Sequence, residues 1–276
     1  MRARAAWLSA LIATSASSPL GAAPSVWQRA KDASSGADPV GAARGYREAL
    51  QLEIMATILG DTRVDATVED LRLRGVGALV AAGAGRSTDP SVLRLLGAMY
   101  ASLRRCDQAE IALSRAIAIA PEDPANASAW FDRAICASTR GDRGGEAAAY
   151  EAALRICDDP RERSVLESNL AEAKMGLGDL AAGIAAAERS IAIRDDVPAA
   201  FWNLAILQDR AGDPAAALAA ARVATALDPD YEFLDGPGVF FEPPYDRHWY
   251  HALGELAAAE GAGASDADRR AHLEAA

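Results

Sequence analysis

The sequence predicts an all-α fold, a solenoid in which helix-turn-helix repeats stack on one another. Two sets of small residues recur along the chain, each in steps of 37, 37 and 34 residues. The first set is Gly97, Ala134, Ala171 and Ala205, and the second is Ala116, Ala153, Ser190 and Ala224. Small residues allow close packing within a helix pair, so this spacing indicates one repeated helical hairpin. The frequent alanine and near absence of β-type alternation agree with this class.

Four units of 34 residues can be aligned, with three extra residues after each of the first two. Within every unit, apolar residues fall at three- and four-residue steps in two stretches, which predicts two amphipathic helices. The units are residues 90–123, 127–160, 164–197 and 198–231. Hairpins of this kind bury their apolar faces only against neighbours, so the fold favours an extended binding surface over a central catalytic pocket.

The connection within each hairpin has its own sequence signal. A glycine can take the left-handed conformation that ends the first helix, and a following aspartate can cap the second helix. Three units have this pair, as Gly141-Asp142, Gly178-Asp179 and Gly212-Asp213, whereas the first has Arg104-Arg105. We therefore expect tight turns at these places.

Several of these positions together resemble the tetratricopeptide repeat family. The first unit carries Leu96, Gly97 and Tyr100 in its first helix, then Ala109, Leu113, Ala116 and Pro121; Trp130 and Phe201 match the family's first-helix aromatic. The departures are Arg133, where leucine is usual, and Glu146, where a small residue is usual. The resemblance covers residues 90–231 and implies a right-handed α-solenoid with a concave groove that binds proteins.

The N-terminus has the order of a cleaved secretory signal, with a basic start, a short apolar run and small residues up to Ala23. We predict a signal peptide over residues 1–23 and an exported, periplasmic, bacterial protein; the alternative is an alanine-rich N-terminal helix. Residues 24–88 are expected to form a helical region with a degenerate repeat. Its final helix should run from about 66 to 82.

The repeats are expected to occupy residues 89–231. Residues 232–247 follow as an aromatic loop rich in proline and glycine, and residues 248–276 as a partial C-terminal repeat or cap. The segment from Asp230 to Tyr250 could fold into the groove or bind a partner. The alternative is that it covers an exposed face of the repeats. We favour the covering role because the ends of solenoids need it.

Composition excludes several kinds of partner and cofactor. The formal net charge is −11, which disfavours nucleic acid as a partner. No stretch after the N-terminal run is long and apolar enough for a transmembrane segment in the mature chain. His248 and His251 lack a third metal ligand, so we predict no metal or other cofactor. Cys106, Cys136 and Cys157 fit no zinc spacing, leaving one disulfide or buried free thiols open.

In the resembling family, the fifth and ninth positions of each unit line the groove. The resemblance implies partner contacts from the residues at these positions, for which we select Arg94, Phe131, Ile135, Trp202 and Ile206. Aromatic side chains are common anchors of protein interfaces. The alternative is that the two rings pack inside the chain. Lysine and asparagine at these two positions, which the family uses to hold a C-terminal carboxylate, are absent from the four units.

The functional prediction is a protein-interaction scaffold or adaptor that binds a partner peptide or helix in the groove. The chain lacks the motifs of nucleophilic, metal-dependent and phosphate-binding enzymes, so we predict that it is not an enzyme. One alternative is an accessory module of a cell-envelope enzyme that handles peptidoglycan or polysaccharide. A weaker alternative is an active site around Tyr245, His248 and His251. The repeat predicts no particular oligomeric state.

Overall fold

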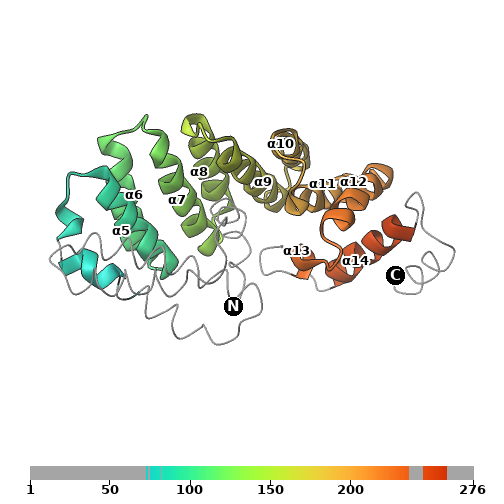
Figure 1. Ribbon diagram of the computed structural model, residues 1–276, viewed down its shortest axis with the longest axis horizontal. Helices are drawn as coiled ribbons and strands as arrows, with labels where there is room; N and C mark the ends of the chain where they lie inside the picture. The colour runs from blue at the N-terminus through green and yellow to red at the C-terminus, as the bar shows by residue number, and fades with distance from the viewer. Residues whose placement is uncertain (1–72, 74, 82, 236–244, 260–276) are drawn as a thin grey trace, which may run out of the picture. The chain divides into compact units, whose positions relative to one another are not determined.

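The computed structural model describes residues 73, 75–81, 83–235 and 245–259 (Figure 1). All regular secondary structure among these residues is helical. The chain divides into two compact units, of which the first ends at Asp158 and the second begins at Asp159. The predicted signal peptide and degenerate repeat lie outside the described residues.

The first unit contains two helical hairpins that pack side by side. One hairpin consists of α5 (Pro90–Ser102) and α6 (Cys106–Ile119), and the other of α7 (Ala127–Thr139) and α8 (Arg143–Ile156). Both α5 and α6 also contact α7, so the hairpins stack as the repeat predicts. Two short 3₁₀ helices, η2 (Ala84–Arg86) and η3 (Pro124–Asn126), precede the two hairpins (Figure 1).

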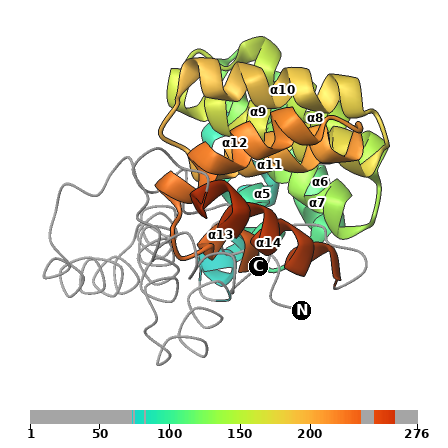
Figure 2. The same cartoon turned by 90° about the vertical axis from the view of Figure 1, so that its right-hand side faces the viewer.

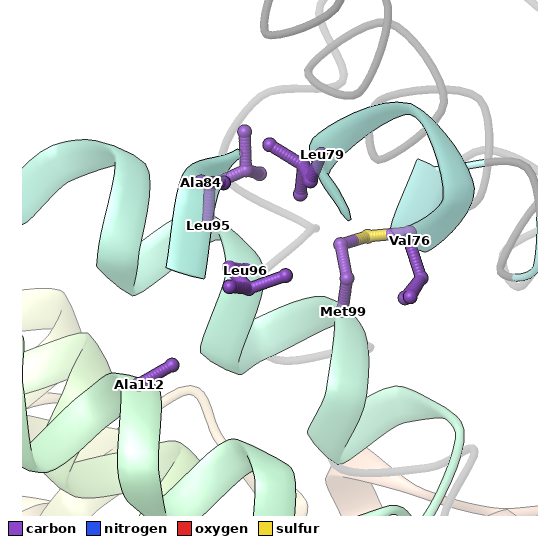
Figure 3. Packing of buried hydrophobic residues seen from close by; sticks show 7 residues of the cluster. All are labelled: Val76, Leu79, Ala84, Leu95, Leu96, Met99 and Ala112. Carbon is purple, nitrogen blue, oxygen red and sulfur yellow. The ribbon is translucent and has the colours of Figure 1, made fainter. Parts of the chain in front are cut away.

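A cluster of buried apolar side chains joins residues 75–81 to the first hairpin. Val76 and Leu79 come from this helical stretch, and Leu95, Leu96 and Met99 come from α5 (Figure 3). Ala84 and Ala112 complete the cluster, and Leu79 is fully buried. The described part of the predicted helix over 66–82 is therefore helical, and it covers one side of α5.

The second unit also contains two hairpins, followed by further helices. The hairpins are α9 (Pro160–Gly176) with α10 (Leu180–Ile193) and α11 (Pro198–Arg210) with α12 (Pro214–Leu227). The α10 helix packs on α11, and α14 (Tyr245–Ala259) packs on α12 (Figure 2). Helix α14 thus takes the place that the first helix of another hairpin would occupy.

Small residues permit close helix packing in both units. A Cβ atom added at Gly97 would lie 2.4 Å from Leu113 in the same hairpin. One added at Gly183 would lie 2.7 Å from Leu207 and 3.2 Å from the carbonyl oxygen of Ala171. Separations below 3 Å require a shift of the neighbour, so a larger side chain at Gly97 or Gly183 would disturb the packing.

The hairpin turns follow the sequence prediction. Gly141, Gly178 and Gly212 have φ angles of 75°, 77° and 83°, the left-handed region that glycine adopts without steric penalty. Each following aspartate caps the next helix: Asp142 accepts from Gly145 N (2.8 Å), Asp179 from Ala182 N (3.2 Å) and Asp213 from Ala216 N (3.0 Å). Arg104, at the glycine position of the first hairpin, also has a left-handed φ of 57°.

The segment after the repeats is more helical than predicted. Glu232–Asp235 form a short helix, α13, and α14 begins at Tyr245. The backbone N–H of Phe233 donates to Asp228 Oδ2 at 3.0 Å and so supports the turn before α13. The glycines and prolines on which the loop prediction rests fall at 236–244, outside the described residues, as do residues 260–276.

Candidate partner-binding surfaces

Two of the predicted groove residues lie together on α7. Phe131 and Ile135 are one helical turn apart, and both side chains are half-buried. The ring of Phe131 packs at 58° to that of Tyr150 on α8, with 5.9 Å between centroids. This contact orients the ring, and part of each of the two side chains stays exposed.

Arg94, the third predicted contact in the first unit, is engaged within the chain. Its side chain is 16% exposed, and its Nη1 donates to Asp123 Oδ2 and to Asn126 Oδ1, both at 3.0 Å. These contacts tie α5 to the connection before α7. The prediction that Arg94 contacts a partner is therefore corrected, because its guanidinium is already bound by Asp123 and Asn126.

The two predicted contacts in the second unit, Trp202 and Ile206, are fully buried, at 0% exposure. The Trp202 ring packs against Tyr231 with 5.9 Å between centroids. A Cβ atom added at Gly254 of α14 would come within 3.0 Å of Trp202 Cη2, so the glycine brings α14 directly onto the indole. The prediction of an accessible Trp202 is wrong because α14 covers it, and Ile206 is equally inaccessible.

The remaining groove positions of the second unit are also closed. Ser168 is 3% exposed and Glu172 is 5% exposed. The side-chain amide of Asn203 donates to the carbonyl oxygen and to the hydroxyl of Ser168, at 3.2 and 3.3 Å. The aromatic contact predicted in the second unit, Trp202, is therefore part of the interior of that unit.

Two side chains hold α14 in this position. Trp249 Nε1 and Tyr250 Oη both donate to Asp209 Oδ2 of α11, at 3.0 and 3.1 Å. Burial raises the pKa of Tyr250 to about 12, and the Asp209 carboxylate adds to the effect. Burial and a hydrogen bond with Glu255 also raise the pKa of Tyr231. Both phenols are thus kept protonated at the junction with α14.

A hollow of about 550 Å³ lies in the first unit, among α6, α7 and α8. At 100° per residue, its α7 side chains are centred roughly 160° around the helix from Phe131 and Ile135. The hollow is therefore on the opposite side of α7. Its lining residues are Glu110, Trp130, Arg133, Ala137, Arg140, Asp142, Gly145, Ala148, Ala149, Ala152 and Arg155.

Arg133 occupies one part of this hollow in a fixed position. Its guanidinium lies 4.4 Å from the centre of the Trp130 ring, a cation–π arrangement. It also forms a two-point ion pair with Glu110, with Nη2–Oε1 at 2.6 Å and Nε–Oε2 at 3.1 Å. Both nitrogens of this pair and the ring face are therefore used inside the chain.

The other two arginines of the hollow are less constrained. Arg140 pairs with Asp107 at 2.8 Å, but their side chains are 43% and 93% exposed. Pairs this exposed contribute about 0–1 kcal/mol and exchange readily with other ions. Arg155 is exposed, and within the described residues its side chain makes no hydrogen bond or ion pair. Asp142 is already engaged in capping α8.

Comparisons with known proteins agree with the repeat pattern. No family model matches the chain, and no curated protein matches it by sequence. The chain is similar to the crystal structure of BtubC (BKLC) from P. vanneervenii, with 19% identity and a TM-score of 0.55, over 75% of this chain and 90% of that one. The MamA RS-1 ArsTM double mutant is similar with 15% identity and a TM-score of 0.51, over 68% and 95%. At these identities the likeness concerns the fold alone.

The fold is that of a tetratricopeptide-like α-solenoid. Among the first-unit departures from the family pattern, Arg133 lines the hollow, which was not predicted from the sequence. Arg133 stands where leucine is usual, and Arg140 follows seven residues later on the same face of α7. Two basic residues on a face that is normally apolar were a signal for a polar recess. Glu146, the other departure, is buried and pairs with Arg143 at 2.7 Å.

The remaining candidate residues of the tetratricopeptide-like chain are two histidines and three cysteines. The ring of His251 packs 4.7 Å from that of Tyr231, and His248 is exposed. Among the described residues, no three histidine, cysteine or acidic side chains form a metal-binding group. Cys106, Cys136 and Cys157 are buried free thiols. Cys106 and Cys136 share one apolar cluster, and burial raises the pKa of Cys136.

Proposed function

We propose that this chain is a protein-interaction scaffold whose partner contacts Phe131 and Ile135 on α7. One observation carries the proposal: this pair stays accessible in the first unit, whereas Trp202 and Ile206 at the equivalent positions are fully buried. The binding surface is accordingly narrower than the sequence pattern suggests. It consists of the α7 face and not of a groove running through all four repeats.

The physical basis is the burial of apolar surface against a rigid helix. Phe131 is already oriented by its contact with Tyr150, so the Phe131 side chain loses little conformational entropy when a partner covers it. Truncation of such an anchor typically weakens binding by about 2 kcal/mol, or roughly 30-fold. For one peptide segment we expect an affinity in the micromolar range, about −8 kcal/mol.

We assign no catalysis to the chain itself. His251 is engaged with Tyr231, and His248 has no neighbouring metal-binding group among the described residues. A role as the positioning module of a cell-envelope enzyme is a special case of the same scaffold function. Export to the periplasm is part of the proposal and is supported by the signal-like order of residues 1–23. None of the described helices is long and apolar enough to cross a membrane.

Quantitative affinity capture from the source organism tests the proposal. The full chain, the double variant Phe131→Ala/Ile135→Ala and the control Ile111→Ala serve as baits. Ile111 is an apolar residue of α6 that is 65% exposed, so it controls for general loss of surface hydrophobicity. We expect the double variant to recover at least about fivefold less of the partner, given the usual weight of interface anchors.

The control should recover as much partner as the wild-type chain. Thermal unfolding of each bait checks that the substitutions leave the fold intact. Equal recovery by the double variant and the wild type would contradict the assignment of the partner to the α7 face.

A further inference from the structure

The residues that line the hollow in the first unit are distributed along the second hairpin. Arg140 stands at the C-terminal end of α7, beside the turn that leads into α8, and Arg155 stands near the C-terminal end of α8. Because paired helices of a hairpin run in opposite directions, these arginines mark opposite ends of the hollow. The ten helical steps from Gly145 to Arg155 span roughly 15 Å along α8.

The charge of the hollow is opposite to that of the chain. The whole sequence has 39 acidic and 28 basic side chains, Lys and Arg, whereas the hollow has three arginines and two carboxylates. Both carboxylates are engaged, Glu110 by Arg133 and Asp142 by the N-terminus of α8. Arg140 is paired with the exposed Asp107, which lies outside the lining, so among the described residues Arg155 is the arginine of the hollow without an ion pair.

The walls between the two arginines suit a polypeptide backbone. On α8, Gly145, Ala149 and Ala152 line the hollow at steps of four and three residues, so no large side chain obstructs this side. On α7, Arg133 covers one face of the Trp130 ring, and Ala137 adds another small side chain to the lining. A distance of about 15 Å corresponds to four or five residues of extended chain.

We propose that this hollow binds a short extended segment of a partner protein that carries an acidic side chain at each end, held by Arg140 and Arg155. Guanidinium groups form two-point hydrogen bonds with carboxylates, which gives this recognition both affinity and direction. The ligand carboxylate displaces Asp107 from Arg140, a small loss because that pair is highly exposed. The site lies on the other side of α7 from Phe131 and is independent of the function proposed above.

Fluorescence anisotropy with a labelled peptide tests the site. The probe is fluorescein-Glu-Ala-Leu-Ala-Glu-amide, and the matched control peptide has glutamine in place of both glutamates. The protein is the full chain, as wild type and as Arg155→Gln, Arg140→Gln and Arg161→Gln. Arg161 is an exposed arginine of α9 in the second unit and serves as the charge-matched control.

The wild type should bind the acidic probe with a dissociation constant below about 1 mM and the glutamine peptide at least about fivefold more weakly, as expected for charge-assisted hydrogen bonds. Arg155→Gln should weaken binding about fivefold, and Arg140→Gln about threefold because Asp107 already competes for it. Arg161→Gln should leave binding unchanged. Melting temperatures close to that of the wild type show that the variants are folded.

Three results would overturn the proposal. They are absence of wild-type binding at about 1 mM, equal binding of the two peptides, and an equal effect of Arg161→Gln and Arg155→Gln. The double variant Phe131→Ala/Ile135→Ala should bind the acidic probe like the wild type. Loss of partner capture with retained probe binding, or the reverse, separates failure of one proposal from failure of the other.

Discussion

Helices α7 and α11 begin equivalent repeats, but the structure uses the same two positions of each helix differently. On α7 these positions hold Phe131 and Ile135, which remain half-buried. On α11 they hold Trp202 and Ile206, which are fully buried. The difference arises from the neighbours of each helix, since the contact of Gly254 on α14 closes the Trp202 position. A residue's place in a repeat therefore does not determine whether a partner can reach it.

The largest expected effect is a difference in the free energy of unfolding between alanine variants at these two aromatic positions. Trp202→Ala should lower the free energy of unfolding by about 3–5 kcal/mol, because it removes a fully buried ring and leaves a cavity. Phe131→Ala should lower it by about 1–2 kcal/mol, because part of that ring is already in contact with water. Denaturant unfolding of both variants measures the difference. Equal losses of unfolding free energy in the two variants would contradict the difference in burial between α7 and α11.

A second prediction concerns the contact that closes the α11 position. A Cβ atom at Gly254 would lie 2.5 Å from Tyr231 Cε1, so Gly254→Ala should destabilise the chain by about 1–3 kcal/mol despite the better helix propensity of alanine.

Gly77, in the helical stretch 75–81, is the matched control because no atom lies within 4 Å of its would-be Cβ. Gly77→Ala should stabilise the chain by up to about 1 kcal/mol. Thermal and denaturant unfolding measure the stability of both variants. If both substitutions changed stability in the same direction, α14 would not pack closely on Trp202 and Tyr231.

A third prediction compares the hairpin turns. Arg104 has a φ of 57°, a region that disfavours residues with a Cβ atom. Arg104→Gly should stabilise the chain by about 0.5–1 kcal/mol after allowing for the extra freedom of glycine in the unfolded state. The reverse change, Gly178→Arg at a φ of 77°, should destabilise it by about 1 kcal/mol. Melting temperatures of the two variants should therefore move in opposite directions.

A fourth prediction, which applies only at alkaline pH, is a pH dependence of the contact between α14 and Asp209. Burial raises the pKa of Tyr250 to about 12, whereas a free tyrosine titrates near pH 10. Folding therefore favours the protonated phenol, and this contribution to stability is complete below about pH 10 and is lost as the pH rises to about 12.

Unfolding measured at several pH values in this range, for the wild type and Tyr250→Phe, checks the assignment. The variant should lose stability less steeply, with a residual loss because the pKa of Tyr231 is raised as well. Parallel curves for the two proteins would show that Tyr250 is not the group responsible.

Much of the fold could be predicted from the sequence because its signals are local. Gly141, Gly178 and Gly212 adopt the left-handed turn, and the aspartate after each one caps the next helix. Gly97 faces Leu113 in the same hairpin, as its place in the repeat suggests. These features depend on residues only a few positions apart or within one hairpin. Helical periodicity is sufficient to locate them.

The accessibility of the candidate site could not be predicted in the same way. Trp202 is covered by α14, which is 52 positions away at Gly254 and follows a segment without the repeat spacing. Arg94 is engaged by Asp123 and Asn126, which are 29 and 32 positions further along the chain. The hollow depends on three helices at once. Arg133 and Arg140 on one face of α7 were the sequence signal for it, but Glu110, the partner of Arg133, belongs to the preceding hairpin.

Hydroxyl-radical footprinting of the unmodified full chain, read residue by residue by mass spectrometry, tests the contrast between α7 and α11 most directly. Trp249 is 54% exposed and provides an internal reference for the fully buried Trp202, which has the same intrinsic reactivity. We expect rapid oxidation of Trp249, measurable oxidation of Phe131 and protection of Trp202. Oxidation of Trp202 at the rate of Trp249, or complete protection of Phe131, would contradict the account.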